Sequence, residues 1–135
     1  MKKLLLIILA MASSLNASAN MDMVIASVNE QAITLQELKE RIVLSKMLIK
    51  RKLSAKEFDV LKTQALDQII SEELKRQYSS KNKITISAVD FNKALEVIET
   101  QRGLEKGSLM TRIPEELIET AKHQIQDSIY QQKII

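Results

Sequence analysis

Few residues in this chain have the types and spacing that chemistry requires. Glu119 and His123 lie one helical turn apart in the predicted last helix, so their side chains could share a metal ion. Two ligands do not make a site, because a zinc ion takes three or four protein ligands. With Lys122 and Gln124 as neighbours, His123 is better explained as part of a solvated helix surface. The sequence therefore predicts no metal site and no cofactor.

The sequence also contains no recognisable nucleophile motif and no acid–base pair. It has no cysteine, no Gly-x-Ser-x-Gly nucleophile elbow and no glycine-rich phosphate loop. Glu72 and Glu73 are adjacent, and adjacent residues of a helix point in different directions, so the two carboxylates do not form an acid and base pair. We expect no catalytic residue.

A cluster of cations lies where the first predicted helix ends. Its members are Lys46, Lys50, Arg51, Lys52 and Lys56. Such a cluster could contact anionic lipid or nucleic acid, but cations are also favourable beside the carbonyl end of a helix. The formal net charge of +3 falls to about +1 once Lys2 and Lys3 are left out. So weak a charge argues against nucleic-acid binding and favours a solvated helix end.

The residues best suited to contact another polypeptide are flexible or terminal apolar side chains. The side chains at 47, 48 and 110 either fill the core or offer an adaptable contact surface. The isoleucines of the last helix share a face, and the chain ends on two more that something should cover. The candidate contact residues are Met47, Leu48, Met110, Ile118, Ile129, Ile134 and Ile135.

The start of the chain has the pattern of a secretory signal. Two lysines precede an apolar run over 4–12, and small residues then lead to Ala19. A membrane anchor needs about 20 apolar residues, and this run is less than half as long. We therefore expect a signal peptide over 1–19, cleaved near Ala19, and one mature domain over 20–135. No later segment is apolar enough to span a membrane, so no stable membrane insertion is expected.

The elements that would position these side chains are mostly helical. Two glycines, one proline and many Leu, Ile, Glu, Lys and Gln residues favour helix. Near the start, β-branched residues over 23–28 and 32–34 flank a polar turn and predict a short hairpin. Three capping boxes, TLQE, SAKE and SAVD, then predict helix starts at Thr34, Ser54 and Ser87.

Breaker residues predict where the helices end. Asn82 is expected to take a left-handed conformation after the longest helix, and Gly103 is expected to do the same after the next one. Residues 104–113 could form a short helix, although Gly107 inside it costs about 1 kcal/mol relative to alanine. Pro114 suits the first turn of the last helix. These patterns predict a mainly α fold, in which a small N-terminal β-hairpin is followed by a bundle of about five helices.

Three motifs follow one another along the chain: IASVN over 25–29, LDQII over 66–70 and ITISAVDFNKAL over 84–95. They match a strand and turn of the form VAxVN, a helix of the LDQLI kind and a helix start of the form IxIS. In this order and spacing the motifs resemble the N-terminal domain of the SurA-type periplasmic chaperones. The resemblance covers nearly all of the expected mature chain, from about 23 to 129.

The resemblance implies that the chain is an ATP-independent holdase of the periplasm. Such chaperones bind unfolded outer-membrane proteins or extended, aromatic-rich segments, and here exposed apolar helix faces would bind them. A non-enzymatic interaction subunit that recognises one specific folded partner is the alternative. Proline isomerase activity is not expected, because the chain has no room for the parvulin domains of the family.

The family's chain also returns at its C-terminus to complete the N-terminal module, and that segment is missing here. We therefore expect apolar surface to be left uncovered on the hairpin and on the first and last helices. A second copy of the chain could cover this surface, so a homodimer is expected.

Overall fold

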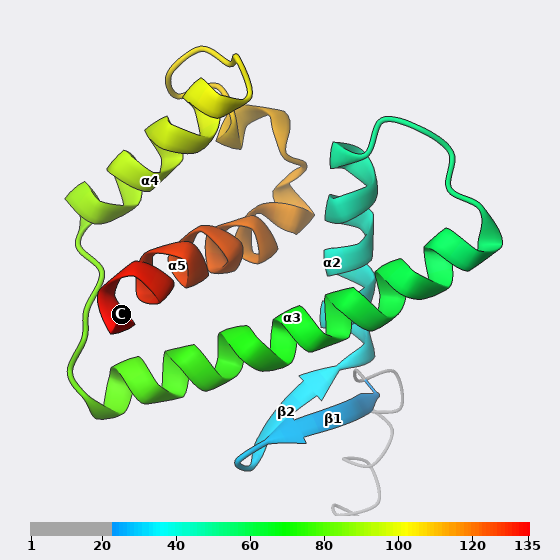
Figure 1. Ribbon diagram of the computed structural model, residues 1–135, viewed down its shortest axis with the longest axis horizontal. Helices are drawn as coiled ribbons and strands as arrows, with labels where there is room; N and C mark the ends of the chain where they lie inside the picture. The colour runs from blue at the N-terminus through cyan, green and yellow to red at the C-terminus, as the bar shows by residue number, and fades with distance from the viewer. Residues whose placement is uncertain (1–22) are drawn as a thin grey trace, which may run out of the picture.

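The computed structural model describes residues 23–135, and the predicted signal peptide lies outside them. In this part of the chain a two-stranded antiparallel hairpin is followed by four α-helices (Figure 1). The elements in chain order are β1 (Val24–Val28), β2 (Gln31–Thr34), α2 (Leu35–Leu48), α3 (Ala55–Lys81), α4 (Ala88–Gln101) and α5 (Ile118–Ile134). This architecture confirms the predicted mainly α fold with a small N-terminal hairpin.

The predicted helix over 104–113 is reduced to a single turn. Between α4 and α5 the structure has two one-turn 3₁₀ helices, Met110–Arg112 and Glu115–Leu117. Gly107 adopts a left-handed conformation with φ 81°, which a right-handed helix does not accommodate. Pro114 precedes the second 3₁₀ turn, which then leads into α5.

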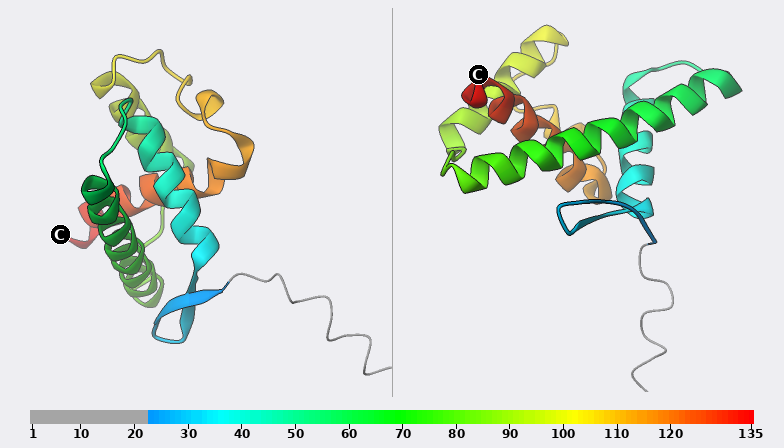
Figure 2. Two further views of the ribbon diagram at one scale, coloured as in Figure 1. Left: turned by 90° about the vertical axis from the view of Figure 1, so that its right-hand side faces the viewer. Right: turned by 60° about the horizontal axis from the view of Figure 1, so that its bottom comes forward.

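The hairpin turns through two residues in the left-handed region, Asn29 with φ 48° and Glu30 with φ 73°. Positive φ at both loop positions is the geometry of a type I′ turn, whose twist matches that of paired strands. Val28 and Ile33 are buried and pack against Ile69 of α3. An isolated hairpin is only marginally stable, so this contact holds it in place, and Figures 1 and 2 show it lying alongside α3.

Local capping starts α2, α3 and α4 as predicted. In each helix the cap hydroxyl accepts the N–H of the third helical residue, whose carboxylate accepts the N–H of the cap. The pairs are Thr34 with Glu37, Ser54 with Glu57, and Ser87 with Asp90. Hydrogen bonds from Arg51 and from the cap lower the pKa of Glu57 to about 2. Lys133 and the cap likewise lower the pKa of Asp90 to about 2.

Of the two residues predicted to end helices in a left-handed conformation, Gly103 does so and Asn82 does not. Gly103 has φ 66° just after α4, as predicted. At the end of α3, Asn82 keeps φ −97°, and the left-handed residue is Lys83 with φ 55°. The Asn82 side-chain amide donates to the Tyr78 carbonyl oxygen at 2.8 Å. Asn82 therefore caps the helix with its side chain, and the left-handed turn falls one residue later.

The helices pack around α5, which lies between α3 and α4 in the views of Figures 1 and 2. The helix α2 contacts both α3 and α5. Leu44 of α2, Ala65 of α3 and Ile125 of α5 are buried. This arrangement brings the end of α2 close to the connection between α4 and α5, where the candidate site lies.

Candidate functional site

An apolar groove opens where α2 ends, beside α4, α5 and the connection between them. Its volume is about 310 Å³. Figure 1 shows why so many elements meet here, because residues 104–117 run from the end of α4 towards α2 before α5 begins. The apolar lining comes from Leu44, Met47, Leu48, Ile98, Leu104, Leu109, Ile113, Ala121 and Ile125.

One wall of the groove is fixed by a buried carboxylate. Glu99 of α4 is 2% exposed and accepts the backbone N–H groups of Gly107 at 2.9 Å and Leu109 at 3.0 Å. The N–H groups of Leu109 and Gly107 lower the pKa of Glu99 below its ordinary value. Because Leu109 lines the groove, Glu99 holds this wall from behind. Sequence reasoning missed Glu99, although a carboxylate four residues after Leu95 on an apolar stripe was a usable signal.

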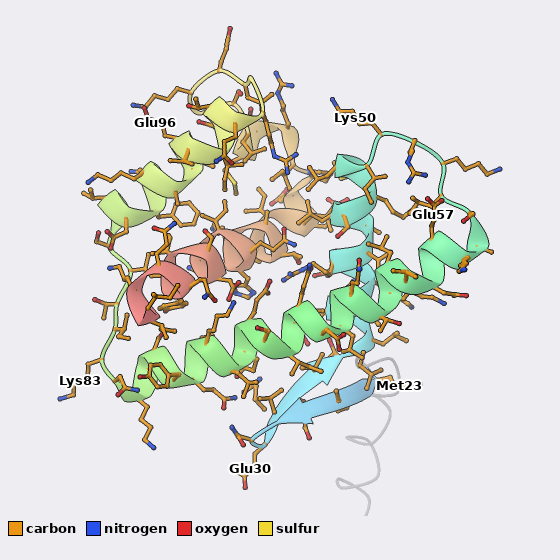
Figure 3. The ribbon with its side chains drawn as sticks, in the orientation of Figure 1. Met23, Glu30, Lys50, Glu57, Lys83 and Glu96 are labelled. Carbon is orange, nitrogen blue, oxygen red and sulfur yellow. The ribbon has the colours of Figure 1, made fainter. Side chains whose placement is uncertain are left out.

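Three cations complete the edge of the groove: Lys50 after α2, Arg102 after α4, and Arg112 in the first 3₁₀ turn. All three residues are exposed, and Lys50 stands at the outer end of α2 in Figure 3. No Asp or Glu of the described chain is among the lining residues. The groove therefore combines an apolar interior with a positively charged edge.

Two of the predicted contact residues lie in this groove. Met47 and Leu48 line it and are 42% and 43% exposed. Met110 and Ile118 are half-buried and do not belong to its lining. Lys50 belongs to the predicted cation cluster, so that cluster contributes to the groove as well as ending α2.

The isoleucines near the chain end that were predicted as contact residues differ in their exposure to solvent. Ile129 is 4% exposed because it lies on the same buried face of α5 as Ile125. It offers no contact surface in this fold, so its assignment as a contact residue needs correction. Ile134 lines a separate shallow hollow that includes Tyr78, and Ile135 is 93% exposed.

A second, polar pocket lies between the hairpin, α2, α3 and α5 and contains His123, the residue first considered for metal binding. His123 is exposed there, as predicted. Glu119 pairs instead with Lys122 at 2.9 Å. Within residues 23–135 no group of three His, Cys, Asp or Glu side chains could hold a metal ion.

Most charges of the polar pocket are paired within the chain. Arg41 of α2 donates both terminal nitrogens to Glu72 of α3 at 2.5 Å, and these side chains are 4% and 16% exposed. Glu73 accepts from Arg76 at 2.6 Å. Sequence reasoning separated Glu72 from Glu73 correctly but missed Arg41, which lies on the buried face of α2. The polar pocket therefore serves the fold, and the groove is the better candidate site.

The fold is a mainly helical domain with an open apolar groove. The family model of the SurA N-terminal domain matches residues 21–134, so the chain belongs to that family, and the predicted resemblance is confirmed. None of the helices in the described part of the chain has the length and hydropathy needed to cross a bilayer.

Curated relatives agree with this assignment. The chain is 32% identical over 121 residues to the protein named Chaperone SurA of Chromobacterium violaceum, covering 84% of this chain and 28% of that protein. It is 31% identical over 94 residues to Chaperone SurA of Legionella pneumophila strain Lens, covering 69% of this chain and 22% of that protein. The chain thus spans about a quarter of the length of the curated relatives it matches. No solved structure matches it.

Proposed function

We propose that the chain is an ATP-independent chaperone whose groove holds extended apolar segments of unfolded proteins. The observation that carries the proposal is the open groove, in which apolar side chains from three helices and a connection surround about 310 Å³. Membership of the SurA N-terminal domain family and two relatives named Chaperone SurA support it. Met47 and Leu48 supply exposed side chains that adapt to different segments.

The size of the groove favours an extended segment over a folded partner. Ligand pockets span roughly 300 to 1,000 Å³, so this groove admits about two or three side chains at a time. Each buried apolar side chain contributes about 1.5–3 kcal/mol, and ordering the segment offsets part of that gain. We expect micromolar binding with rapid release, which suits a protein that holds chains without altering them. A folded partner would need an interface of at least about 1,200 Å².

The proposed clients are unfolded outer-membrane proteins in the periplasm. The predicted signal peptide over 1–19 would deliver the chain to that compartment. Mass spectrometry of the chain from a periplasmic extract should give an N-terminus near Asn20. A chain that stays in the cytoplasm with Met1 intact would contradict this location.

We propose that the chain has no enzymatic activity. Perturbed pKa values often mark catalytic groups. Here the carboxylates whose pKa values fall to about 2, Glu57 and Asp90, cap helices. A proline-isomerisation assay on a short peptide should therefore return the uncatalysed rate, and acceleration by the purified chain would contradict the proposal.

We further propose that a second copy of the chain covers apolar surface away from the groove. Ile135 is 93% exposed, Tyr78 is 51% exposed and Leu74 is 48% exposed. Leu74, Tyr78 and Ile134 share one shallow hollow, which a symmetric contact between two copies would fill. Size-exclusion chromatography with light scattering should give twice the mass of the mature chain at micromolar concentration, and a stable monomer would contradict the dimer.

The binding proposal is tested with a fluorescent, aromatic-rich unfolded peptide, followed by anisotropy. Replacing Met47 and Leu48 together with serine should weaken binding about tenfold, because two apolar contacts are lost. Val43→Ser is the matched control, since Val43 lies on α2, is 48% exposed and does not line the groove. The unaltered chain should also suppress aggregation of a denatured outer-membrane β-barrel protein without ATP. Absence of peptide binding, or an equal loss in the control, would overturn the assignment of the groove.

A further inference from the structure

The arginines of this chain divide into two groups. Arg41, Arg51 and Arg76 each pair with a glutamate, at nitrogen–oxygen distances of 2.5, 2.8 and 2.6 Å. Arg102 and Arg112 form no ion pair within residues 23–135. Both of these arginines line the groove. The guanidinium groups that the fold leaves without a carboxylate therefore stand together at the candidate site.

Two carboxylates of α4 close to the groove are engaged elsewhere. Glu96 of α4 pairs with Lys106 at 3.3 Å. Glu99 is buried and accepts the two N–H groups of the neighbouring wall. Neither residue lines the groove, and no other Asp or Glu of the described chain does so. Within residues 23–135, Lys50, Arg102 and Arg112 therefore form no ion pair with a carboxylate.

We propose that the groove selects apolar segments that carry Asp or Glu beside their apolar residues. This inference rests on the proposed function and names the chemistry of the preferred client. The apolar side chains of the client enter the groove, and its carboxylates pair with Lys50 on the α2 side and with Arg102 and Arg112 on the side of α4 and the connection. Arginine suits this role because its planar guanidinium binds a carboxylate through two parallel hydrogen bonds.

Each ion pair between a client carboxylate and a cation of the groove should add only a modest preference for acidic segments, but two or three pairs together should add an appreciable one. An exposed ion pair changes affinity by roughly twofold to fivefold, so two or three pairs favour an acidic segment over a neutral one by roughly tenfold. Cations next to an apolar wall also raise the local concentration of anionic segments. Both effects are screened by salt, which separates them from the apolar contribution.

The experiment compares three fluorescent peptides that share one apolar, aromatic core and differ only in flanking residues, which are Glu, Gln or Lys. Anisotropy with the purified chain at low salt should rank affinity in the order Glu, Gln, Lys, with about tenfold between the first two. At about 1 M salt, where the screening length is about 3 Å, the three affinities should converge.

Charge-neutralising variants locate the preference. Arg102→Gln combined with Arg112→Gln should remove most of the preference for the Glu peptide over the Gln peptide, because only Lys50 of the three cations remains at the edge of the groove. Lys52→Gln combined with Lys56→Gln is the matched control, because both lysines are exposed, outside the groove and without an ion pair within residues 23–135. The control should keep the preference. An equal loss in the control would mean general charge attraction and would overturn the inference.

The Gln peptide separates the failure of this inference from the failure of the proposed function. Equal binding of all three peptides leaves the chaperone groove standing and removes the acidic preference. No binding of any peptide removes both. Decanoate or vesicles of anionic lipid that bind at Arg102 and Arg112 more tightly than the Glu peptide would assign these cations to a lipid and overturn the inference.

Discussion

The polar pocket and the apolar groove share the helices α2 and α5, but their charged side chains differ in whether they are paired. In the pocket, α2 contributes Arg41, which is paired with Glu72, and α5 contributes Asp127, which is paired with Lys75 at 3.1 Å. In the groove, the same two helices contribute apolar side chains, and the cations of the edge have no partner in the described chain. The paired charges of the pocket thus contribute to folding, whereas the cations of the groove, which are unpaired within the described chain, are free to pair with another molecule.

Breaking the buried ion pair of the pocket should have the largest effect. Arg41→Ala leaves Glu72, whose side chain is 16% exposed, without its partner. Removing one member of a buried pair costs about 3–5 kcal/mol, against a typical domain stability of about 5–15 kcal/mol. Urea denaturation measures the loss.

Two further variants sharpen this test. Arg41→Met combined with Glu72→Leu should recover most of the stability, because no unpaired charge remains buried. Arg51→Ala removes an exposed pair, whose side chains are 62% and 44% exposed, and should shift the urea midpoint far less. If Arg41→Ala were as stable as the unaltered chain, the Arg41–Glu72 ion pair would not contribute to the stability of the fold.

Lowering the pH should reduce the stability that the capping carboxylates give the helices, and it should do so before it changes peptide binding in the groove. In the folded chain the pKa of Glu57 and that of Asp90 are about 2, against ordinary values of 4.5 and 3.8. Because the folded values are lower, these carboxylates stabilise the fold above their ordinary pKa values, and this contribution is lost as the pH falls towards 2. The lowered pKa of Glu99 acts in the same direction.

Urea midpoints measured across pH check the sign of this effect. They should stay nearly constant from about pH 7 to 5 and fall steadily below about pH 4.5. Binding of the Gln peptide should not vary over the upper range, since no carboxylate of the described chain lines the groove. A midpoint that rises as the pH falls below about 4 would contradict the role of the capping carboxylates.

Glu99→Gln tests whether the groove depends on its buried carboxylate. A glutamine side chain has one carbonyl oxygen and cannot accept from Gly107 and Leu109 with two separate oxygens, as Glu99 does. We expect these two amides to exchange hydrogen faster and the affinity for an apolar peptide to fall by roughly threefold to tenfold. Glu96→Gln is the control on the same helix, because Glu96 is exposed. Equal exchange in both variants would show that the wall is held by other contacts.

The features that the sequence predicted correctly are encoded within a few residues. The capping boxes at Thr34, Ser54 and Ser87 each need only a hydroxyl and a carboxylate three positions later. The end of α4 needs only Gly103, whose φ is 66°. Asn82 shows the limit of such rules, because its side-chain bond to Tyr78 moves the left-handed turn to the next residue.

The site depends on contacts between distant residues, so the sequence predicted only part of it. Met47 and Leu48 were predicted as contact residues because flexible apolar side chains suit a contact surface, and both line the groove. Arg41 could not be identified, since its partner Glu72 is 31 residues away. Ile129 shares a face with Ile125, as periodicity predicts, but this face is buried rather than uncovered, since α3 and α4 both pack against α5.

The smallest effect is expected from His123→Ala. His123 lines the polar pocket but is exposed, so its removal should change the free energy of unfolding by less than about 0.5 kcal/mol. Zinc should not raise the melting temperature, because Glu119 is paired with Lys122 and no three-ligand group exists within residues 23–135. Thermal unfolding with and without zinc checks both points. A zinc-dependent rise in melting temperature that disappears in His123→Ala would contradict this view of the two sites. The polar pocket would then bind a ligand through His123, rather than only stabilise the fold.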